Sequence, residues 1–267
     1  MLKEGKINLM VMAGTKDAAN IIKKLKSAQK FYILATTTTK YGAEITKSAG
    51  ADEVLSRKLD LNDLINLIKE KDIAILVDAT HPFAAAATQN AVKASESKEI
   101  KYLRFERPRE TIDDHKLMHK VFSFEEAASK ALELTDEKTR LLHLAGVFTL
   151  DKIIEKNDKN NIYARVLPSI ESIQKCLDLG LKQENIIAMQ GTFSKEFNKA
   201  LIEEYNISMI ITKESGATGG MMPKINAALE LGVQVVLVTR PEIPELSNKD
   251  VFTNLNDIIK FILKLEE

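Results

Sequence analysis

The chain has 267 residues, of which 45% are hydrophobic and 28% charged, so it can form about two globular domains with substantial cores. Its 38 basic and 38 acidic side chains cancel to a net charge of zero, which excludes a global attraction to nucleic acid or to a membrane surface. Cys176 is the single cysteine, which excludes an internal disulfide and predicts a reducing, cytoplasmic environment.

No apolar run approaches the ~18 residues that a membrane span needs, and the first apolar run is too short for a signal peptide. The expectation is a protein that neither spans nor binds a membrane.

Short β-branched runs alternate with amphipathic stretches, which is typical of parallel sheets covered by helices. Strands are predicted over residues 7–13, 31–36, 53–55, 73–77 and 102–105, with helices that begin near residues 17, 40, 61 and 84. Further strands are predicted over 118–122, 141–144, 162–167, 186–189, 209–212 and 235–238, and a last helix over 255–265. The pattern predicts an α/β fold of two doubly wound Rossmann-like domains, with mainly parallel sheets and a ligand cleft between them.

The polar stretch 107–115 contains a proline and has no hydrophobic period, which is typical of a linker. The predicted domains are therefore an N-terminal Rossmann-like domain at 1–108 and a C-terminal one at 109–267. An alternative is that the final helix packs back on the first domain.

The tenth predicted strand leads into three glycines and then a helix. Gly216, Gly219 and Gly220 permit positive φ and a close backbone approach, and the first turn of the helix offers N–H groups to an anion. Lys224 opposes the helix dipole there, so it requires an anionic neighbour or full solvation. The spacing differs from the Gly-x4-Gly-Lys-Ser/Thr nucleotide loop, because Ile225 stands where a hydroxyl would be needed. An anion site and a plain structural loop both fit.

Other polar and glycine-containing segments also follow predicted strands, at the edge where open α/β sheets bind ligands. They lie at 13–17, 35–42, 78–84, 144–146 and 190–194 and at the Ser215 loop. Thr15, Thr80 and Ser194 are ordinary N-cap types, so each alone fits a helix cap. Their concentration at strand ends favours two ligand-binding rims.

Five segments carry a family resemblance. They are Asp-Ala-Thr-His-Pro-Phe-Ala at 78–84, Tyr-Leu-Arg-Phe-Glu-Arg-Pro at 102–108, Met-Gln-Gly-Thr-Phe-Ser at 189–194, Thr-Lys-Glu-Ser-Gly at 212–216 with the later glycines and lysine, and Val-Thr-Arg-Pro at 238–241. In this order, over nearly the whole chain, the sequence resembles the precorrin-6A reductase family, including its cobalt-precorrin-6A branch. It departs from the family at Ala13 and Asp17, where Gly and Glu are usual, and at Thr192, where proline is common.

The resemblance implies an NAD(P)H-dependent oxidoreductase of cobalamin (vitamin B12) biosynthesis. Such an enzyme reduces a macrocycle double bond of (cobalt-)precorrin-6A to give (cobalt-)precorrin-6B. The implied partners are the corrinoid substrate, NADPH or NADH, and other cobalamin-pathway enzymes, without nucleic acid or membrane. Two alternatives stay open: a nucleotide-binding sensor module, and a phosphotransferase that uses the Ser215–Gly216 loop and Lys224. The latter lacks paired carboxylates for magnesium.

A substrate with many carboxylates needs local cations on a neutral protein. The predicted substrate-binding residues are Arg104, Arg107, Gln190, Ser194, Lys213, Ser215, Gly216, Gly219, Gly220 and Lys224. The predicted cofactor-binding residues are Gly14, Thr15, Thr37, Thr38, Lys40 and Thr80. Hydroxyls and a lysine after the second strand fit a 2′-phosphate, which favours NADPH without excluding NADH.

A proton must accompany the hydride. His81 is the first candidate donor because imidazole titrates near neutrality, and Asp78, Glu214 and bound water are others. Orientation of the substrate or helix capping is the alternative role for His81. No metal site is predicted, because His115 and His119, four residues apart, fall in a linker and a strand instead of a helix.

Overall fold

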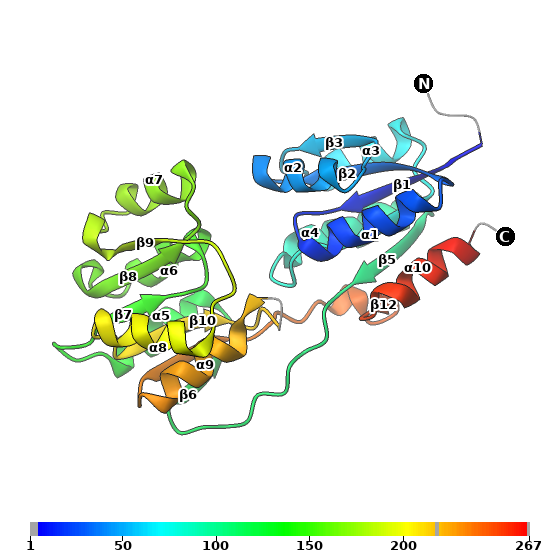
Figure 1. Cartoon of the computed structure of the whole chain (residues 1–267). Coiled ribbons are helices and arrows are strands. Elements are labelled where there is room, and N and C mark those ends of the chain that lie inside the picture. The colour runs from blue at the N-terminus through cyan, green and yellow to red at the C-terminus, as the bar shows by residue number, and fades with distance from the viewer. Residues whose placement is uncertain (1–4, 217–218, 266–267) are drawn as a thin grey trace. The chain divides into compact units, whose positions relative to one another are not determined.

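A computed structural model of the chain describes residues 5–216 and 219–265, and it separates into two compact units (Figure 1). The first unit combines Met1–Pro108 with Glu242–Glu267, and the second is Arg109–Pro241. The chain therefore passes between the units twice, and the second unit is inserted into the sequence of the first.

The first unit is built on a six-stranded parallel sheet with the order β12-β5-β4-β1-β2-β3. Its strands are β1 (Ile7–Met12), β2 (Phe31–Thr37), β3 (Glu53–Ser56), β4 (Ile75–Asp78), β5 (Lys101–Phe105) and β12 (Asp250–Phe252). Its helices are α1 (Lys16–Ser27), α2 (Lys40–Ser48), α3 (Leu61–Glu70), α4 (Ala85–Ser97) and α10 (Leu255–Lys264), with a 3-10 turn at Pro244–Leu246.

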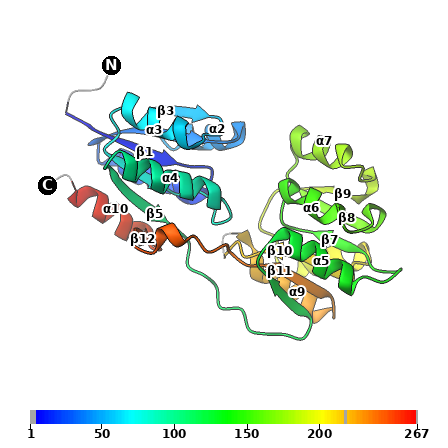
Figure 2. The ribbon, with the colours of Figure 1, turned by 180° about the vertical axis from the view of Figure 1, so that it is seen from behind.

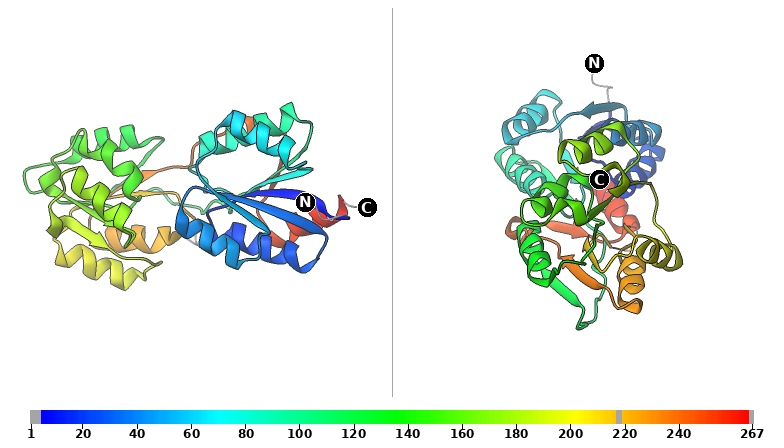
Figure 3. Two further views of the ribbon diagram at one scale, coloured as in Figure 1. Left: turned by 90° about the horizontal axis from the view of Figure 1, so that it is seen from above. Right: turned by 90° about the vertical axis from the view of Figure 1, so that its left-hand side faces the viewer.

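Alternation along the buried strands divides the core of this unit into two layers. On β1, Leu9 and Val11 pack with residues of α1 and α10, while Met10 and Met12 pack with residues of α3 and α4. Figure 3 shows helices on both sides of the sheet. Both faces of the strands are therefore buried, and only the strand ends remain for polar residues.

The second unit repeats this plan with the strand order β6-β11-β10-β7-β8-β9, again all parallel. Its strands are β6 (Met118–Val121), β7 (Leu141–His143), β8 (Ile162–Val166), β9 (Ile186–Ala188), β10 (Met209–Lys213) and β11 (Gln234–Val238). Its helices are α5 (Phe124–Leu134), α6 (Leu150–Ile154), α7 (Ile170–Asp178), α8 (Lys195–Glu204) and α9 (Met221–Glu230), with 3-10 turns at Val147–Thr149, Lys159–Asn161 and Gln183–Asn185. Helices α8 and α9 cover one face (Figure 1) and α5 and α6 the other (Figure 2).

Each predicted strand is present at or near its expected residues, so the predicted α/β fold with two Rossmann-like units is confirmed. Strand β12 was not predicted, because Asp-Val-Phe has only two apolar residues between polar neighbours and so gives no apolar run. Helix α9 begins at Met221, so Pro223 and Lys224 both lie in its first turn. None of the helices in the described residues is long and apolar enough to cross a membrane.

The expected second domain, 109–267, differs from the second unit, which ends at Pro241. The reason lies in the last helix, where Ile258 and Ile262 have no exposed surface and belong to the core of the first unit. Before this helix, β12 extends the first sheet by pairing with β5. Burial of one apolar helix face and one added strand thus returns the chain to the unit where it began.

Candidate functional site

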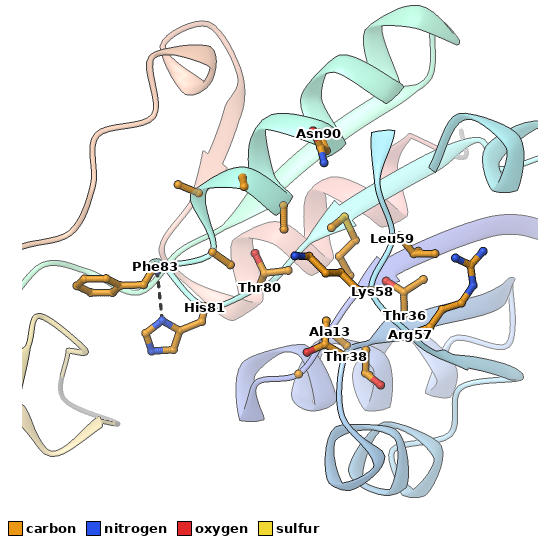
Figure 4. A pocket seen from close by; sticks show the side chains of 17 residues that line it. Ala13, Thr36, Thr38, Arg57, Lys58, Leu59, Thr80, His81, Phe83 and Asn90 are labelled. Atoms are coloured by element: carbon orange, nitrogen blue, oxygen red, sulfur yellow. Dashed lines mark hydrogen bonds between the residues drawn. The ribbon is translucent and has the colours of Figure 1, made fainter. Parts of the chain in front are cut away.

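A pocket of about 450 Å³ lies at the carboxyl edge of the first sheet (Figure 4). It is lined by the turns that follow β1, β2, β3 and β4, at the edge where open α/β sheets bind ligands. Its polar lining consists of Thr36, Thr37, Thr38, Arg57, Lys58, Thr80, His81 and Asn90, around Gly14. Alanines of the α4 start, Leu59 and Phe83 make the rest of the wall mostly apolar.

The turn after β1 has one glycine, Gly14, ahead of the start of α1 and lacks the Gly-x-Gly-x-x-Gly fingerprint. Gly14 has a φ of 109°, which a side chain would strain, and a Cβ there would meet no atom within 4 Å. The predicted cofactor residue Thr15 is instead the N-cap of α1, where it accepts from the Ala18 N–H (3.1 Å) and donates to the Ala79 carbonyl (2.9 Å). Thr15 therefore fixes the turn and does not line the pocket.

The cations of the pocket differ from the one that the sequence singled out. Lys40 is exposed on the first turn of α2 and is absent from the lining. Arg57 and Lys58, directly after β3, line the pocket beside Thr37 and Thr38. Because β3 pairs with β2, the basic pair after the third strand was the signal that could have identified them.

A fully buried ion pair organises the end of β4. The Arg104 Nη1 donates to Asp78 Oδ1 at 2.8 Å, and neither side chain has any exposed surface. Asp78 also accepts from the Tyr102 hydroxyl (3.0 Å), and from the N–H (3.0 Å) and hydroxyl (2.7 Å) of Thr80. Burial raises the pKa of Tyr102 above its ordinary value, so this hydroxyl keeps its proton and donates a hydrogen bond to Asp78.

The network and one neighbouring ion pair show where three of the predicted site residues lie. Arg104 was predicted to bind substrate, but its guanidinium is enclosed between Asp78 and Thr80 and has no exposed surface. Asp78, a predicted proton donor, is a buried charge partner that orders the turn leading to His81. Arg107, another predicted substrate residue, is ion-paired with Asp17 of α1.

His81 lines the pocket, and its ring orientation is fixed locally (Figure 4). The Phe83 N–H donates to His81 Nδ1 at 3.2 Å, and the two rings lie 5.8 Å apart between centroids. Because Nδ1 accepts this hydrogen bond, the proton of the neutral imidazole is assigned to Nε2.

In the second unit, the backbone conformation around Ser215 requires glycine at the neighbouring positions. Gly216 and Gly220 have φ values of 71° and 62°, and a Cβ on Gly219 would collide with the Ser215 side chain. Helix α9 begins after Gly220 without a side-chain cap. Ala217 and Thr218, between the glycines, lie outside the described residues.

A cluster of three cations lies at the carboxyl side of the second sheet: Arg165 of β8, Lys213 of β10 and Lys224 of α9. Burial, then the nearby charges of Arg165 and Lys213, lower the pKa of Lys224 to about 7. Burial also lowers the pKa of Lys213, and lowers that of Arg165 to about 10. The Lys224 ammonium donates to the Gly219 carbonyl at 3.1 Å.

Arg165 was missed by the sequence analysis because it lies within a predicted strand. Its Nη1 donates to Asn198 Oδ1 at 2.9 Å, and its guanidinium carbon lies 5.0 Å from the centre of the Phe193 ring. Asn198 is held in turn by donating to the Ser194 carbonyl at 2.6 Å. The guanidinium is thus positioned by an amide and an aromatic face.

The remaining predicted residues have other settings. Glu214 accepts from the Arg240 N–H at 2.9 Å, and their charged groups approach to 3.6 Å, so this buried carboxylate ties the end of β10 to that of β11. Ser194 is exposed and caps α8 by accepting from the Phe197 N–H at 3.1 Å. Gln190 is exposed after β9.

The chain is similar to known proteins over most of its length. Residues 8–263 match the family model of the precorrin-6x reductase CbiJ/CobK. A cobalt-precorrin-6A reductase of Methanothermobacter thermautotrophicus is 45% identical over 260 residues, covering 97% of this chain and 85% of that protein. One of Methanocaldococcus jannaschii is 41% identical and covers 97% of this chain and 100% of that protein. A solved structure of CobK precorrin-6A reductase has a TM-score of 0.75 over 97% of each chain at 20% identity, which shows a shared fold.

Replacing Asp78 by alanine should lower the free energy of unfolding of the first unit by about 3–5 kcal/mol, because the buried Arg104 then keeps only the more distant carboxylate of Glu106, at 3.6 Å. Urea denaturation followed by amide hydrogen exchange in β4 and β5 measures the change. Glu96→Ala is the control, since Glu96 pairs with Lys249 at an exposed position, where the loss should stay below about 1 kcal/mol. Equal losses in the two variants would show that the buried pair has no organising role.

Proposed function

The chain belongs to the precorrin-6x reductase (CbiJ/CobK) family, and on that premise we propose that it is the cobalt-precorrin-6A reductase of a cobalamin pathway. The reaction reduces one double bond of the macrocycle at the expense of a reduced nicotinamide cofactor. The observation that carries the proposal is the identity of 45% and 41% to two cobalt-precorrin-6A reductases over 97% of the chain. The sensor and phosphotransferase alternatives find no support among these relatives.

The pocket of the first unit is the proposed cofactor site. Its residues fit a dinucleotide, since Gly14 gives a tight turn before a helix N-terminus, and Thr37, Thr38 and Thr80 offer hydroxyls. When bound, the cofactor supplies the hydride that reduces the substrate. The protein supplies the turn, the donors and the apolar wall that limits water.

We propose that Arg57 and Lys58 make NADPH the preferred cofactor. Both cations line the pocket next to the hydroxyls after β2, where an adenosine ribose lies in this fold class. A 2′-phosphate would pair with them, whereas the 2′-hydroxyl of NADH gains little from a cation. Lys40, outside the lining, is no longer the residue on which this preference rests.

The second unit is the proposed site for the carboxylates of the corrinoid. The loop of Ser215, Gly216, Gly219 and Gly220 brings backbone groups to an uncapped helix start, and Lys213 and Lys224 add positive charge. Gln190 and Ser194, exposed after β9, are proposed as further polar contacts.

His81 is the proposed proton donor. The two predicted carboxylates are engaged in ion pairs, Asp78 with Arg104 and Glu214 with Arg240, and these contacts order their turns. His81 lines the pocket and carries a proton on Nε2 in its neutral form. We therefore assign Asp78 and Glu214 positioning roles, not catalytic ones.

The proposed activity is tested by mixing the purified protein with cobalt-precorrin-6A and either NADPH or NADH. The expected result is loss of the reduced-nicotinamide absorbance in step with a change in the corrinoid spectrum. Cofactor binding without oxidation would favour a sensor module and contradict the reductase. Cobalt-free precorrin-6A in a parallel reaction determines which branch of the family the chain serves.

The Lys58→Glu variant should raise the KM for NADPH by at least about tenfold and leave the KM for NADH nearly unchanged, because a carboxylate there repels a 2′-phosphate. Steady-state kinetics with both cofactors measures the ratio. Lys40→Glu is the matched control, a charge reversal of an exposed lysine outside the pocket lining, and should leave the ratio near that of the wild type. A larger effect from Lys40→Glu would assign the phosphate to α2 instead.

The His81→Ala variant should lower kcat by about a hundredfold with little change in the KM for NADPH, because general acid catalysis contributes at about this level. A solvent-isotope effect on kcat, together with the KM and kcat values, separates proton donation from binding. Near-normal turnover of His81→Ala would end the acid assignment.

A further inference from the structure

The cations of the second unit differ from ordinary buried charges because two of them have no acidic partner. Among the described residues, Arg165 and Lys224 take part in no ion pair, and no carboxylate contributes to the pKa of either. Arg165 is 9% exposed and Lys224 is partly buried. A buried charge is normally paired or discharged, since desolvation disfavours the charged form.

The neighbouring charged groups leave that charge uncompensated. Strand β10 contributes Lys213, whose charge adds to the repulsion, and β11 contributes no titratable side chain. Helix α8 packs on α9, but its Lys195 and Lys199 pair with Glu230, at the far end of α9.

The nearest carboxylate in sequence is committed elsewhere. Glu214 follows Lys213 directly but accepts from the Arg240 N–H and approaches its guanidinium to 3.6 Å. The cluster therefore has an excess of positive charge at the end of the sheet where a ligand would bind.

The local geometry suits a carboxylate. Arg165 is held by Asn198 at 2.9 Å and by the face of Phe193, so one edge of its planar fork is fixed in direction. Lys224 is anchored by donating to the Gly219 carbonyl, and it stands in the first turn of α9, a ten-residue helix without a side-chain cap. A carboxylate at this position would accept hydrogen bonds from the Arg165 guanidinium, the Lys224 ammonium and the N–H groups at the start of α9.

We propose that Arg165 and Lys224 form a subsite for one carboxylate of the substrate, and that entry of this carboxylate transfers one proton from solvent to the Lys224 amine. This inference rests on the proposed function for the identity of the ligand, a polycarboxylate corrinoid. Before binding, burial, together with repulsion from Arg165 and Lys213, keeps much of Lys224 neutral. After binding, the negative charge of the carboxylate offsets part of this repulsion, and the ammonium becomes the stable form.

The sign of the pH dependence follows. The pKa of Lys224 in the free protein is lowered to about 7, and a bound carboxylate raises it. Affinity should therefore be highest below pH 7 and fall above it, with Kd rising about fivefold between pH 7 and pH 8. The proton uptake on binding should be about 0.9 at pH 8 and about 0.1 at pH 6.

The experiment is calorimetric titration of the whole protein with cobalt-precorrin-6A in the presence of oxidised cofactor, so that no turnover occurs. Two buffers of different protonation enthalpy, neither of which contains carboxylate or phosphate, give the number of protons taken up. The Lys224→Arg variant should bind without uptake and with a Kd independent of pH from 6 to 9, because guanidinium stays charged. Lys199→Met, which removes a partly exposed lysine of α8 that pairs with Glu230, should behave like the wild type.

The Arg165→Met variant tests the contribution of the guanidinium to the subsite. Loss of this charge should weaken binding about tenfold or more and also move the onset of the pH dependence upward, because one of the charges that lower the pKa of Lys224 is gone. Circular dichroism of each variant establishes that it is folded. Equal affinity and uptake in the wild type and Arg165→Met would overturn the subsite.

The two proposals fail separately. Turnover of cobalt-precorrin-6A by the wild type, combined with uptake that persists in Lys224→Arg, would overturn the subsite and leave the reductase standing. Binding with the expected uptake but without oxidation of NADPH would overturn the reductase and support the subsite.

Discussion

The parallel direction of every strand is the constraint on which both units depend. Each sheet buries both of its faces under helices, so polar residues are tolerated only where strands end, and parallel strands end at a common edge. Turns that are far apart in sequence, after β1, β2, β3 and β4, thereby line one pocket. The strand order and direction alone therefore gather the polar turns at one edge of each sheet.

Each edge has a buried ion pair, Asp78 with Arg104 in the first unit and Glu214 with Arg240 in the second, but the second edge also holds cations without a carboxylate partner among the described residues. In the first unit, Asp78 and Arg104 neutralise each other without exposed surface, and the result is a rigid turn next to the pocket. In the second unit, Arg165 and Lys224 are brought together without a carboxylate among the described residues. A buried ion pair holds the local backbone in one conformation, whereas a buried cation without a partner favours binding of an anionic ligand. The first edge is thus suited to holding geometry and the second to attracting anions.

The fold and the position of both rims could be predicted from the sequence, because β-branched runs, helix caps and glycines report local structure directly. What could not be predicted depends on which side chains meet across strands. Arg104 was predicted from the sequence to bind substrate, and only the pairing of β4 with β5 places it against Asp78. Arg165 lies within a strand, where nothing in the sequence indicated a binding role. That Lys58 and not Lys40 lines the pocket depends on the pairing of β2 with β3. Strand β12 has only two apolar residues between polar neighbours, so no apolar run marked it.

The twofold passage of the chain between units has a consequence for biosynthesis on the ribosome. The outer edge of β5 acquires its partner β12, and α1 its partner α10, only when the last part of the chain has been translated. The inserted unit is complete by Pro241 and can fold while the edge of β5 still lacks its partner strand. During this interval the nascent protein presents an open row of backbone donors and acceptors, which is the usual template for misassociation and a natural target for chaperones.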